Sequence, residues 1–232
     1  MNNNNIGIIG GGNLGKSIAN GLVNFGNYKA ADISIYRRNE KHLSELKEKG
    51  FDTATSNVDL INNNNVIIIA VLPQQIDKVL EEIAPYLTTE KLVVSVVTSV
   101  ELSEIRDKLN GHDNIVRAMP NTAISLGQSM TCICADKEQT EGLEFVKSIF
   151  DKLGQAIIIN ENQMTSATAL CACGTAFFLR AIRAAMQGGT EIDFHAEEAL
   201  LMAAQTAKGA AMLLLENGSH PEEEIDKVTS PK

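Results

Sequence analysis

The stretch Ile6-Gly-Ile-Ile-Gly10-Gly11-Gly12-Asn13-Leu14-Gly15 decides the fold of this chain. It runs from a short aliphatic segment into a helical pattern and contains the spacing Gly10-x-Gly12-x-x-Gly15. Between a strand and a helix, this spacing is typical of a dinucleotide-binding turn, in which the glycines allow a tight bend, close approach of a pyrophosphate and close helix–strand packing. The sequence therefore predicts an anion site at the N-terminus of the first helix. A purely structural glycine turn is the alternative.

The residues that follow repeat this change from strand to helix. Short runs rich in Ile and Val recur between helical segments, and they read as strands buried on both faces, as in a parallel sheet. The predicted strands are Ile6–Ile9, Ile33–Tyr36, Val66–Val71, Leu92–Val97, Ile115–Ala118, Met130–Cys134 and Ala156–Ile159. This alternation of strands and helices indicates an α/β fold, namely a doubly wound Rossmann domain.

After about residue 161 the pattern changes to long helical windows rich in Ala, Leu and Met. We expect a Rossmann domain over residues 1–160 and an all-helical domain over residues 161–232, with helix stops at Gly188-Gly189 and Asn217-Gly218. The window Ala167–Leu179 carries no charge, and a helix that is apolar all round must be covered on all sides. Its cover is either the first domain or a second copy of the chain.

Composition narrows the classes of function. The chain has 232 residues and a net charge of −9, which argues against a nucleic-acid partner, because a basic surface supplies most of that affinity. There is no charged n-region of a secretory signal, and we expect no membrane partner and a cytoplasmic location. The four cysteines form two Cys-x-Cys pairs, not a disulfide framework or the usual zinc spacing, so we expect buried free thiols and no metal site.

The end of the second predicted strand indicates which cofactor is preferred. An enzyme that uses NAD carries Asp or Glu at this point to bond the ribose 2′-hydroxyl. Here the strand Ile33–Tyr36 is followed by Arg37, Arg38 and Asn39. Guanidinium groups suit a 2′-phosphate, so the sequence predicts NADP(H), with NAD(H) as the alternative. A solvated basic turn remains the other interpretation of the two arginines.

These features lie in a chain that resembles the pyrroline-5-carboxylate reductase family from Ile6 to Pro231. The glycine-rich motif is general among dinucleotide-binding proteins, whereas later motifs are more specific. They include Val116-Arg117-x-Met119-Pro120-Asn121-Thr122, Thr168-Ala169-Leu170, Ala204-Gln205-Thr206 and Val228-Thr229-Ser230-Pro231.

The resemblance implies reduction of 1-pyrroline-5-carboxylate to L-proline, a small-molecule substrate, by hydride from NAD(P)H. It implies a helical domain that interleaves with a second subunit, giving a homodimer or a higher homo-oligomer. The cofactor-binding residues that it implies are Gly10, Gly12, Asn13, Leu14, Arg38, Asn39, Asn57, Ala70, Val71, Leu72, Pro73 and Val97. Glu161 and Ser230 match positions near the substrate.

The sequence departs from the family pattern near the substrate site. It stops at Ser230-Pro231-Lys232, where the family continues with Gly-Gly-Thr-Thr, and Cys171-Ala-Cys173 replaces a Ser-Gly-Ser segment. Three explanations stay open: a shortened form of a longer reductase, a diverged reductase for another imine or carbonyl, and a homologue that binds NADP(H) without this catalysis.

Overall fold

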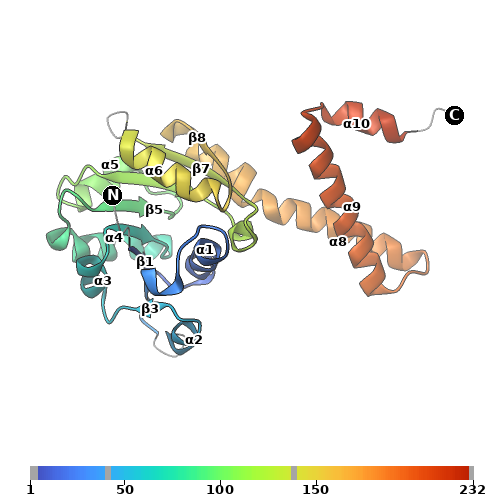
Figure 1. Ribbon diagram of the computed structural model, residues 1–232. Helices are drawn as coiled ribbons and strands as arrows, with labels where there is room; N and C mark the ends of the chain where they lie inside the picture. The colour runs from blue at the N-terminus through green and yellow to red at the C-terminus, as the bar shows by residue number, and fades with distance from the viewer. Residues whose placement is uncertain (1–4, 40–42, 137–139, 230–232) are drawn as a thin grey trace. The chain divides into compact units, whose positions relative to one another are not determined.

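Eight strands form one sheet in the part of the chain that the computed structural model describes, residues 5–39, 43–136 and 140–229 (Figure 1). The order is β3-β2-β1-β4-β5-β6-β7-β8. The strands are β1 (Ile6–Ile9), β2 (Ile33–Tyr36), β3 (Asp52–Thr53), β4 (Val66–Ile69), β5 (Leu92–Ser95), β6 (Ile115–Met119), β7 (Ser129–Ala135) and β8 (Gly154–Ile158). From β3 to β6 all neighbours are parallel, whereas β7 runs antiparallel to β6 and β8 parallel to β7.

Helices connect these strands and continue the chain beyond them. The α-helices are α1 (Asn13–Asn24), α2 (Leu43–Glu48), α3 (Asn57–Asn63), α4 (Pro73–Ile83), α5 (Leu102–Lys108), α6 (Thr140–Asp151), α7 (Met164–Ala167), α8 (Gly174–Glu191), α9 (Ala196–Asn217) and α10 (Pro221–Val228). Short 3-10 segments include η4 (Thr122–Leu126) and η5 (Glu161–Gln163), and η6 (Thr168–Ala172) is a π-helical turn.

The α/β prediction is confirmed, because each of the seven predicted aliphatic runs overlaps a strand. Strand β3 was not predicted, because Asp52 and Thr53 do not belong to a hydrophobic run; this short strand pairs with β2 at the edge of the sheet. The antiparallel direction of β7 was also not predicted. A buried strand shows the same continuous hydrophobicity in either direction when helices cover both of its faces.

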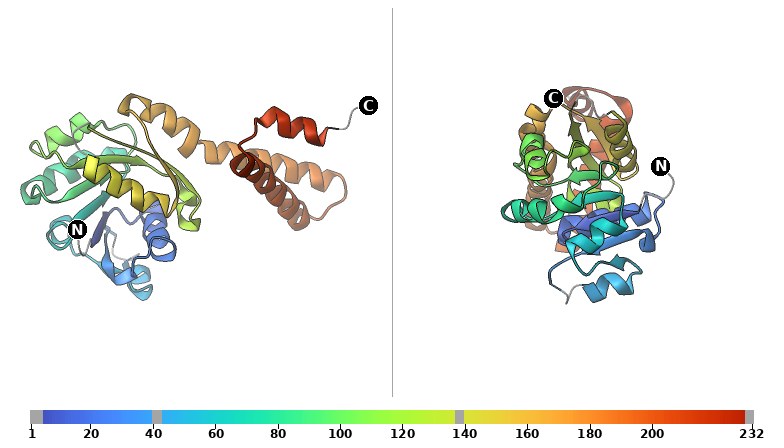
Figure 2. Two further views of the ribbon diagram at one scale, coloured as in Figure 1. Left: turned by 45° about the horizontal axis from the view of Figure 1, so that its top comes forward. Right: turned by 90° about the vertical axis from the view of Figure 1, so that its left-hand side faces the viewer.

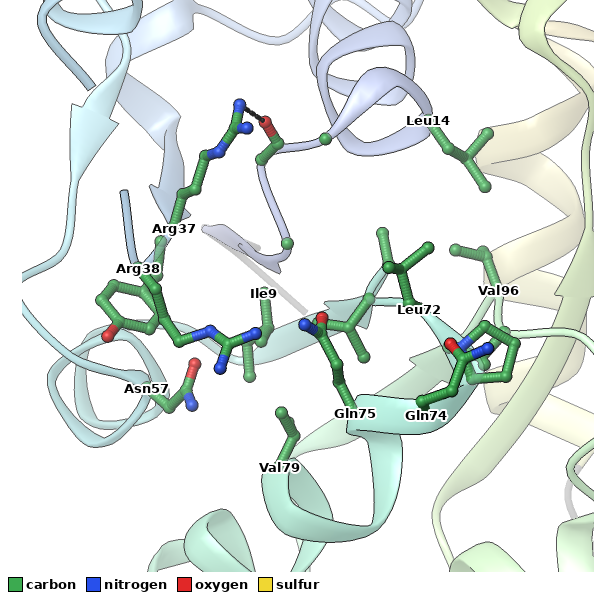
Figure 3. Close-up of a pocket in the computed structure, with 18 of the residues that line it drawn as sticks. Ile9, Leu14, Arg37, Arg38, Asn57, Leu72, Gln74, Gln75, Val79 and Val96 are labelled. Atoms are coloured by element: carbon green, nitrogen blue, oxygen red, sulfur yellow. Dashed lines mark hydrogen bonds between the residues drawn. The ribbon is translucent and has the colours of Figure 1, made fainter. Parts of the chain in front are cut away.

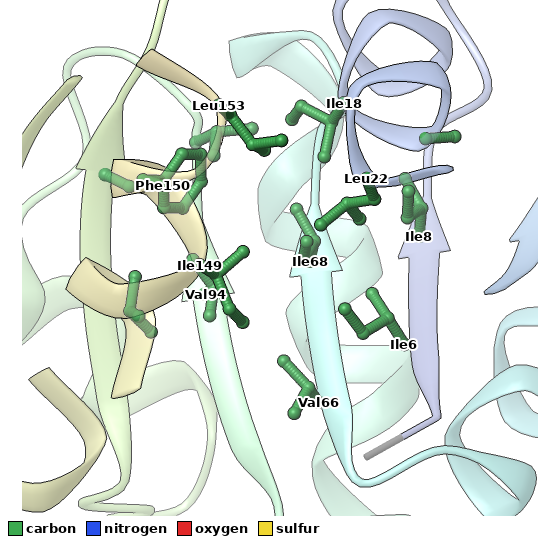
Figure 4. Packing of buried hydrophobic residues seen from close by; sticks show 14 of the residues in the cluster. Ile6, Ile8, Ile18, Leu22, Val66, Ile68, Val94, Ile149, Phe150 and Leu153 are labelled. Carbon is green, nitrogen blue, oxygen red and sulfur yellow. The ribbon is translucent and has the colours of Figure 1, made fainter. Parts of the chain in front are cut away.

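Helices cover both faces of the sheet (Figure 2), and a hydrophobic core on each face holds the layers together. On one face, Ile18 and Leu22 of α1 and Phe150 of α6 pack over the strands (Figure 4). On the other face, the apolar sides of α3, α4 and α5 cover the opposite side chains of the same strands. Because successive side chains of a strand point to opposite faces, Ile8 belongs to the first core and Ile9 to the second.

The position of β1 in the sheet determines where a ligand site is expected. Strand β1 lies between β2 and β4, so β2 and β3 extend the sheet on one side of β1, and β4 and the later strands extend it on the other. In open α/β sheets the crevice at this reversal of strand order, at the carboxyl ends of the strands, receives the ligand.

The chain divides into two compact units, Met1–Cys173 and Gly174–Lys232. The segment between 161 and 173 belongs to the first unit because Met164 and Ala167 are buried in its second core. The predicted boundary at 160/161 lies earlier in the chain and stays a prediction.

In the second unit, α8 and α9 pack against each other at a glycine. A Cβ on Gly189 would lie 2.9 Å from the Cβ of Ala199, so glycine permits the close approach of the two helices. The expected helix stop at Gly188-Gly189 is therefore wrong, because α8 continues to Glu191. The second stop is confirmed, since α9 ends at Asn217 and Gly218 takes the left-handed conformation, with φ +64°.

The helical part of the chain exposes much apolar surface. Phe177, Phe178 and Leu201 are more than 60% exposed. By length and composition alone, the helical stretches Glu161–Glu191 and Ala196–Asn217 are long and apolar enough to cross a bilayer, which is weak evidence for a membrane span. Such helices require a cover, which lipid or protein could provide.

Candidate functional site

A cavity of about 910 Å³ opens at the carboxyl edge of the sheet, beside the turn that joins β1 to α1 (Figure 3). This volume is near the upper end of the range for small-molecule sites, about 300–1,000 Å³, and suits a ligand of dinucleotide size. All twelve residues predicted to bind the cofactor line this cavity, although they come from five separate parts of the chain: Gly10, Gly12, Asn13, Leu14, Arg38, Asn39, Asn57, Ala70, Val71, Leu72, Pro73 and Val97.

The glycine turn is built by close contacts of its backbone. Gly10 has φ +111°, and its N–H donates to the carbonyl of Tyr36 at 3.0 Å. A Cβ on Gly15 would lie 2.1 Å from the Gly10 carbonyl oxygen, so only glycine allows α1 to begin this close to the turn. A Cβ on Gly12 would meet nothing within 4 Å. Gly12 therefore faces open space, where a ligand can approach the backbone.

The N-terminus of α1 is suited to an anion. Gly12 is the N-cap residue, no side chain caps the helix, and the first turn holds no acidic residue. The first N–H groups of a helix have no partner within the helix and carry its positive end. They can bind the pyrophosphate of a dinucleotide without competition from a carboxylate of this turn.

The two arginines after β2 have different roles. Arg37 Nη1 donates to the carbonyl oxygen of Gly11 at 2.9 Å, so this side chain holds the glycine turn in place. Arg38 is exposed, and its guanidinium extends over the cavity toward Asn57 (Figure 3). Among the two, Arg38 is the one placed to meet a phosphate on the ligand.

Asn57 lines the cavity and carries an acceptor without a hydrogen-bond partner. The residue is 5% exposed, and its Nδ2 donates to Glu82 Oε2 at 3.0 Å. Its Oδ1 is buried without a hydrogen-bond partner in the structure. A buried acceptor without a partner is unfavourable, so an N–H donor from a ligand would stabilise this end of the cavity. The exocyclic amine of adenine is such a donor.

The opposite end of the cavity is mainly apolar. Ala70, Val71 and Leu72 follow β4, while Val96 and Val97 follow β5. Leu72 is 63% exposed, which is high for a leucine on this edge of a sheet. These residues form a surface suited to a flat, uncharged ring.

The polar side chains that α4 contributes to the cavity were not predicted from the sequence. Gln74, Gln75, Lys78 and Glu82 line the cavity, and Figure 3 shows Gln75 on the side of Arg38. Three of them, Gln75, Lys78 and Glu82, recur at helical spacing on one face of α4. A polar face of an amphipathic helix ordinarily meets solvent, so the pattern gave no reason to assign them to a site.

Of the two residues expected near the substrate, Glu161 is described, and it is not among the residues that line the cavity. Glu161 Oε1 accepts from Arg117 Nη1 at 2.5 Å and from the backbone N–H of Leu102 at 2.7 Å. Close by, burial raises the pKa of the Cys134 thiol to about 11; Glu161 adds to this shift, while Arg117 opposes it. Ser230 lies outside the described residues. Among the described residues, no three His, Cys, Asp or Glu side chains are arranged to hold a metal ion.

Two family models match separate parts of the chain. A model described as NADP oxidoreductase, coenzyme F420-dependent, matches residues 5–99, which carry the glycine turn and the residues that line the cavity. A model described as pyrroline-5-carboxylate reductase dimerisation matches residues 161–232.

Curated and solved proteins are similar over nearly the whole chain. Pyrroline-5-carboxylate reductase 2 of Dictyostelium discoideum is 47% identical over 99% of this chain and 82% of its own length. Pyrroline-5-carboxylate reductase 1 of the same organism is also 47% identical over 99% of this chain, which spans 44% of that longer relative. The crystal structure of Plasmodium falciparum pyrroline carboxylate reductase with NADP bound has a TM-score of 0.89 at 27% identity, over 100% of this chain and 86% of that chain.

Proposed function

The chain belongs to the pyrroline-5-carboxylate reductase family, and we propose that it reduces the C=N bond of 1-pyrroline-5-carboxylate to give L-proline, with NAD(P)H as the reductant. The observation that carries the proposal is the convergence of twelve predicted cofactor residues on one cavity of suitable size. NADPH, when bound, supplies a hydride to the imine carbon, and one proton completes the amine.

The chain's own residues supply positioning. The free N–H groups at the start of α1 bind the pyrophosphate, and Asn57 Oδ1 accepts from the adenine amine. The apolar residues Ala70, Leu72 and Val97 hold the nicotinamide end of the cavity and limit its contact with water. Fixing a hydride donor beside an imine lowers the barrier largely through proximity and orientation.

We assign the substrate side to Glu161 and Ser230, by the resemblance that places both near the imine acid. Glu161 is held by two donors through a single oxygen, Oε1, so the orientation of its carboxylate is fixed. This orientation supports a role in shaping the substrate side.

NADP(H) is the proposed cofactor in preference to NAD(H). The similar Plasmodium falciparum structure has NADP bound. In this chain Arg38 extends over the cavity, and residues 37–39 contain no carboxylate that would repel a 2′-phosphate. A guanidinium binds phosphate with strong, charge-assisted hydrogen bonds.

The activity is tested by following the absorbance of NADPH at 340 nm while the purified chain meets 1-pyrroline-5-carboxylate, beside a fluorescence titration of NADPH alone. We expect saturable turnover with one L-proline formed per NADPH oxidised. Binding of NADPH without turnover would overturn the reductase proposal and favour a binding homologue. Absence of both would also overturn the cofactor assignment.

We further propose that residues 161–232 form a homodimer, or a higher homo-oligomer built from it, and that the protein is cytoplasmic. The family model for dimerisation over these residues and the exposed Phe177, Phe178 and Leu201 support a protein cover in place of lipid. Light scattering after gel filtration without detergent should give at least twice the chain mass of 25.0 kDa. A monomer, or a requirement for detergent, would contradict this assignment. The variant Phe178→Glu should contain a larger fraction of monomer than the wild-type protein.

A further inference from the structure

Two cysteine thiols that the proposed reduction does not use lie in contact. Cys132 Sγ and Cys171 Sγ are 3.8 Å apart, although 39 positions separate them in the chain. Cys132 is buried on β7, whereas Cys171 is partly exposed in the π-helical turn η6. The other two cysteines differ in burial, since Cys134 is buried and Cys173 exposed.

The backbones on both sides of this contact are held independently of the sulfur atoms. Cys132 pairs with Met119 in the antiparallel ladder between β6 and β7. The carbonyl of Cys171 accepts from Asn121 Nδ2 at 3.2 Å. A disulfide requires an S–S distance of about 2.05 Å, so the two sulfur atoms must approach each other from 3.8 Å for the bond to form.

We propose that Cys132 and Cys171 are an oxidisable pair that forms an intrachain disulfide in the presence of hydrogen peroxide. Cys171, the accessible member, attacks the peroxide as its thiolate and becomes a sulfenic acid, while the O–O bond breaks and one water leaves. The Cys132 sulfur then attacks the Cys171 sulfur, its proton joins the departing hydroxyl, and the second water forms. In sum, two thiols and one peroxide give one disulfide and two waters.

The surroundings of the two sulfurs agree with this order of events. Burial raises the pKa of Cys132 to about 12, and the neighbouring Cys171 adds to the shift, so Cys132 remains a thiol at neutral pH. A buried thiol reacts slowly with oxidants from solution, because the thiolate is the reactive form. Its attack on a sulfenic acid held beside it is intramolecular, however, and benefits from proximity.

The bridge would fasten the turn η6 to the sheet. It closes a loop that contains α6 and β8, and such a closure restricts the unfolded chain more than the folded one. In a reducing compartment the bond would be transient, so the test includes its reversal by a thiol reductant.

The experiment uses the full chain, reduced, freed of reductant and treated with one equivalent of hydrogen peroxide. A thiol count under denaturing conditions should fall from four to two, and a proteolytic digest should contain one peptide pair linked through Cys132 and Cys171. Dithiothreitol should restore all four thiols. The oxidised chain should unfold about 4–10 °C above the reduced one.

Matched variants identify the pair. Cys173→Ser should keep both the bridge and the temperature shift, whereas Cys171→Ser should lose both. Because Cys171 is partly exposed, the serine at this position should leave the reduced chain folded, as far-ultraviolet circular dichroism would verify. Cross-links between chains through Cys173, a sulfinic acid on Cys171 without a bridge, or four unchanged thiols would each overturn the proposal.

Discussion

The guanidinium of Arg117, on β6, donates to the carboxylate of Glu161, which follows β8, with Nη1 and Oε1 2.5 Å apart. Arg117 is buried, with 6% of its side chain exposed, and Glu161 is 32% exposed. The same Oε1 accepts from the backbone N–H of Leu102 at the start of α5. Through this one oxygen, Glu161 links strand β6 and the start of helix α5 to the segment that follows β8.

Removing Glu161 should therefore destabilise the protein. Glu161→Ala leaves a buried guanidinium without its counter-charge, and we expect a loss of about 2–4 kcal/mol, below the value for a fully buried pair because solvent reaches Glu161. Urea unfolding followed by circular dichroism measures the change. In the matched double variant Arg117→Met, Glu161→Gln, neither charge is left unpaired, so its loss should be smaller. A single variant as stable as the wild type would show that the ion pair contributes nothing.

Arg38 should decide between the two nicotinamide cofactors. Arg38→Ala should raise KM for NADPH about 10–100-fold while changing KM for NADH less than about threefold, because only NADPH carries the phosphate. Initial rates with each cofactor at saturating substrate provide the measurement. Arg37→Ala is the control, since Arg37 holds the Gly11 carbonyl and its loss should weaken both cofactors alike. Equal effects of Arg38→Ala on the two cofactors would contradict this role.

Several features of the fold that depend on a local sequence pattern were predicted correctly. The aliphatic runs predicted the buried strands, and the spacing of Gly10, Gly12 and Gly15 predicted the turn. At Gly10 and Gly15 only glycine tolerates the close backbone contacts that this turn requires. The cavity-lining residues carried over from the resemblance also lie together. Their roles in binding remain predictions until the variants are measured.

Interactions between distant residues could not be predicted in the same way. Glu161 and Arg117 are 44 positions apart, and no periodicity links an acidic residue to a basic residue across a sheet. Gly189 was misread because a glycine that stops a helix and one that admits a neighbouring helix look identical in one sequence. The contact of Cys132 with Cys171 likewise follows only from the fold.

Ser99, in the loop after β5, should be a site where glycine stabilises the protein. Its φ is +63°, in the left-handed region that a residue with a Cβ adopts at a cost. Ser99→Gly removes that cost but adds freedom to the unfolded chain, so we expect a net gain of about 0.5–1 kcal/mol. Ser99→Ala keeps the unfavourable conformation and should gain nothing. If both variants have the same midpoint in urea, the strain assigned to Ser99 is wrong.

Gly12 and Gly15 should separate cofactor binding from folding, although they belong to one motif. A Cβ on Gly12 meets only open space, and its φ of −79° suits alanine, so Gly12→Ala should fold with nearly the wild-type midpoint. Its methyl group would occupy space that the pyrophosphate needs, and we expect KM for NADPH to rise at least about tenfold. Gly15→Ala places its Cβ 2.1 Å from the Gly10 carbonyl oxygen, so it should lower the free energy of unfolding by about 2–4 kcal/mol. Thermal unfolding and NADPH titration of both variants provide the comparison. A normal NADPH affinity in Gly12→Ala would mean that the pyrophosphate does not approach the backbone at this turn.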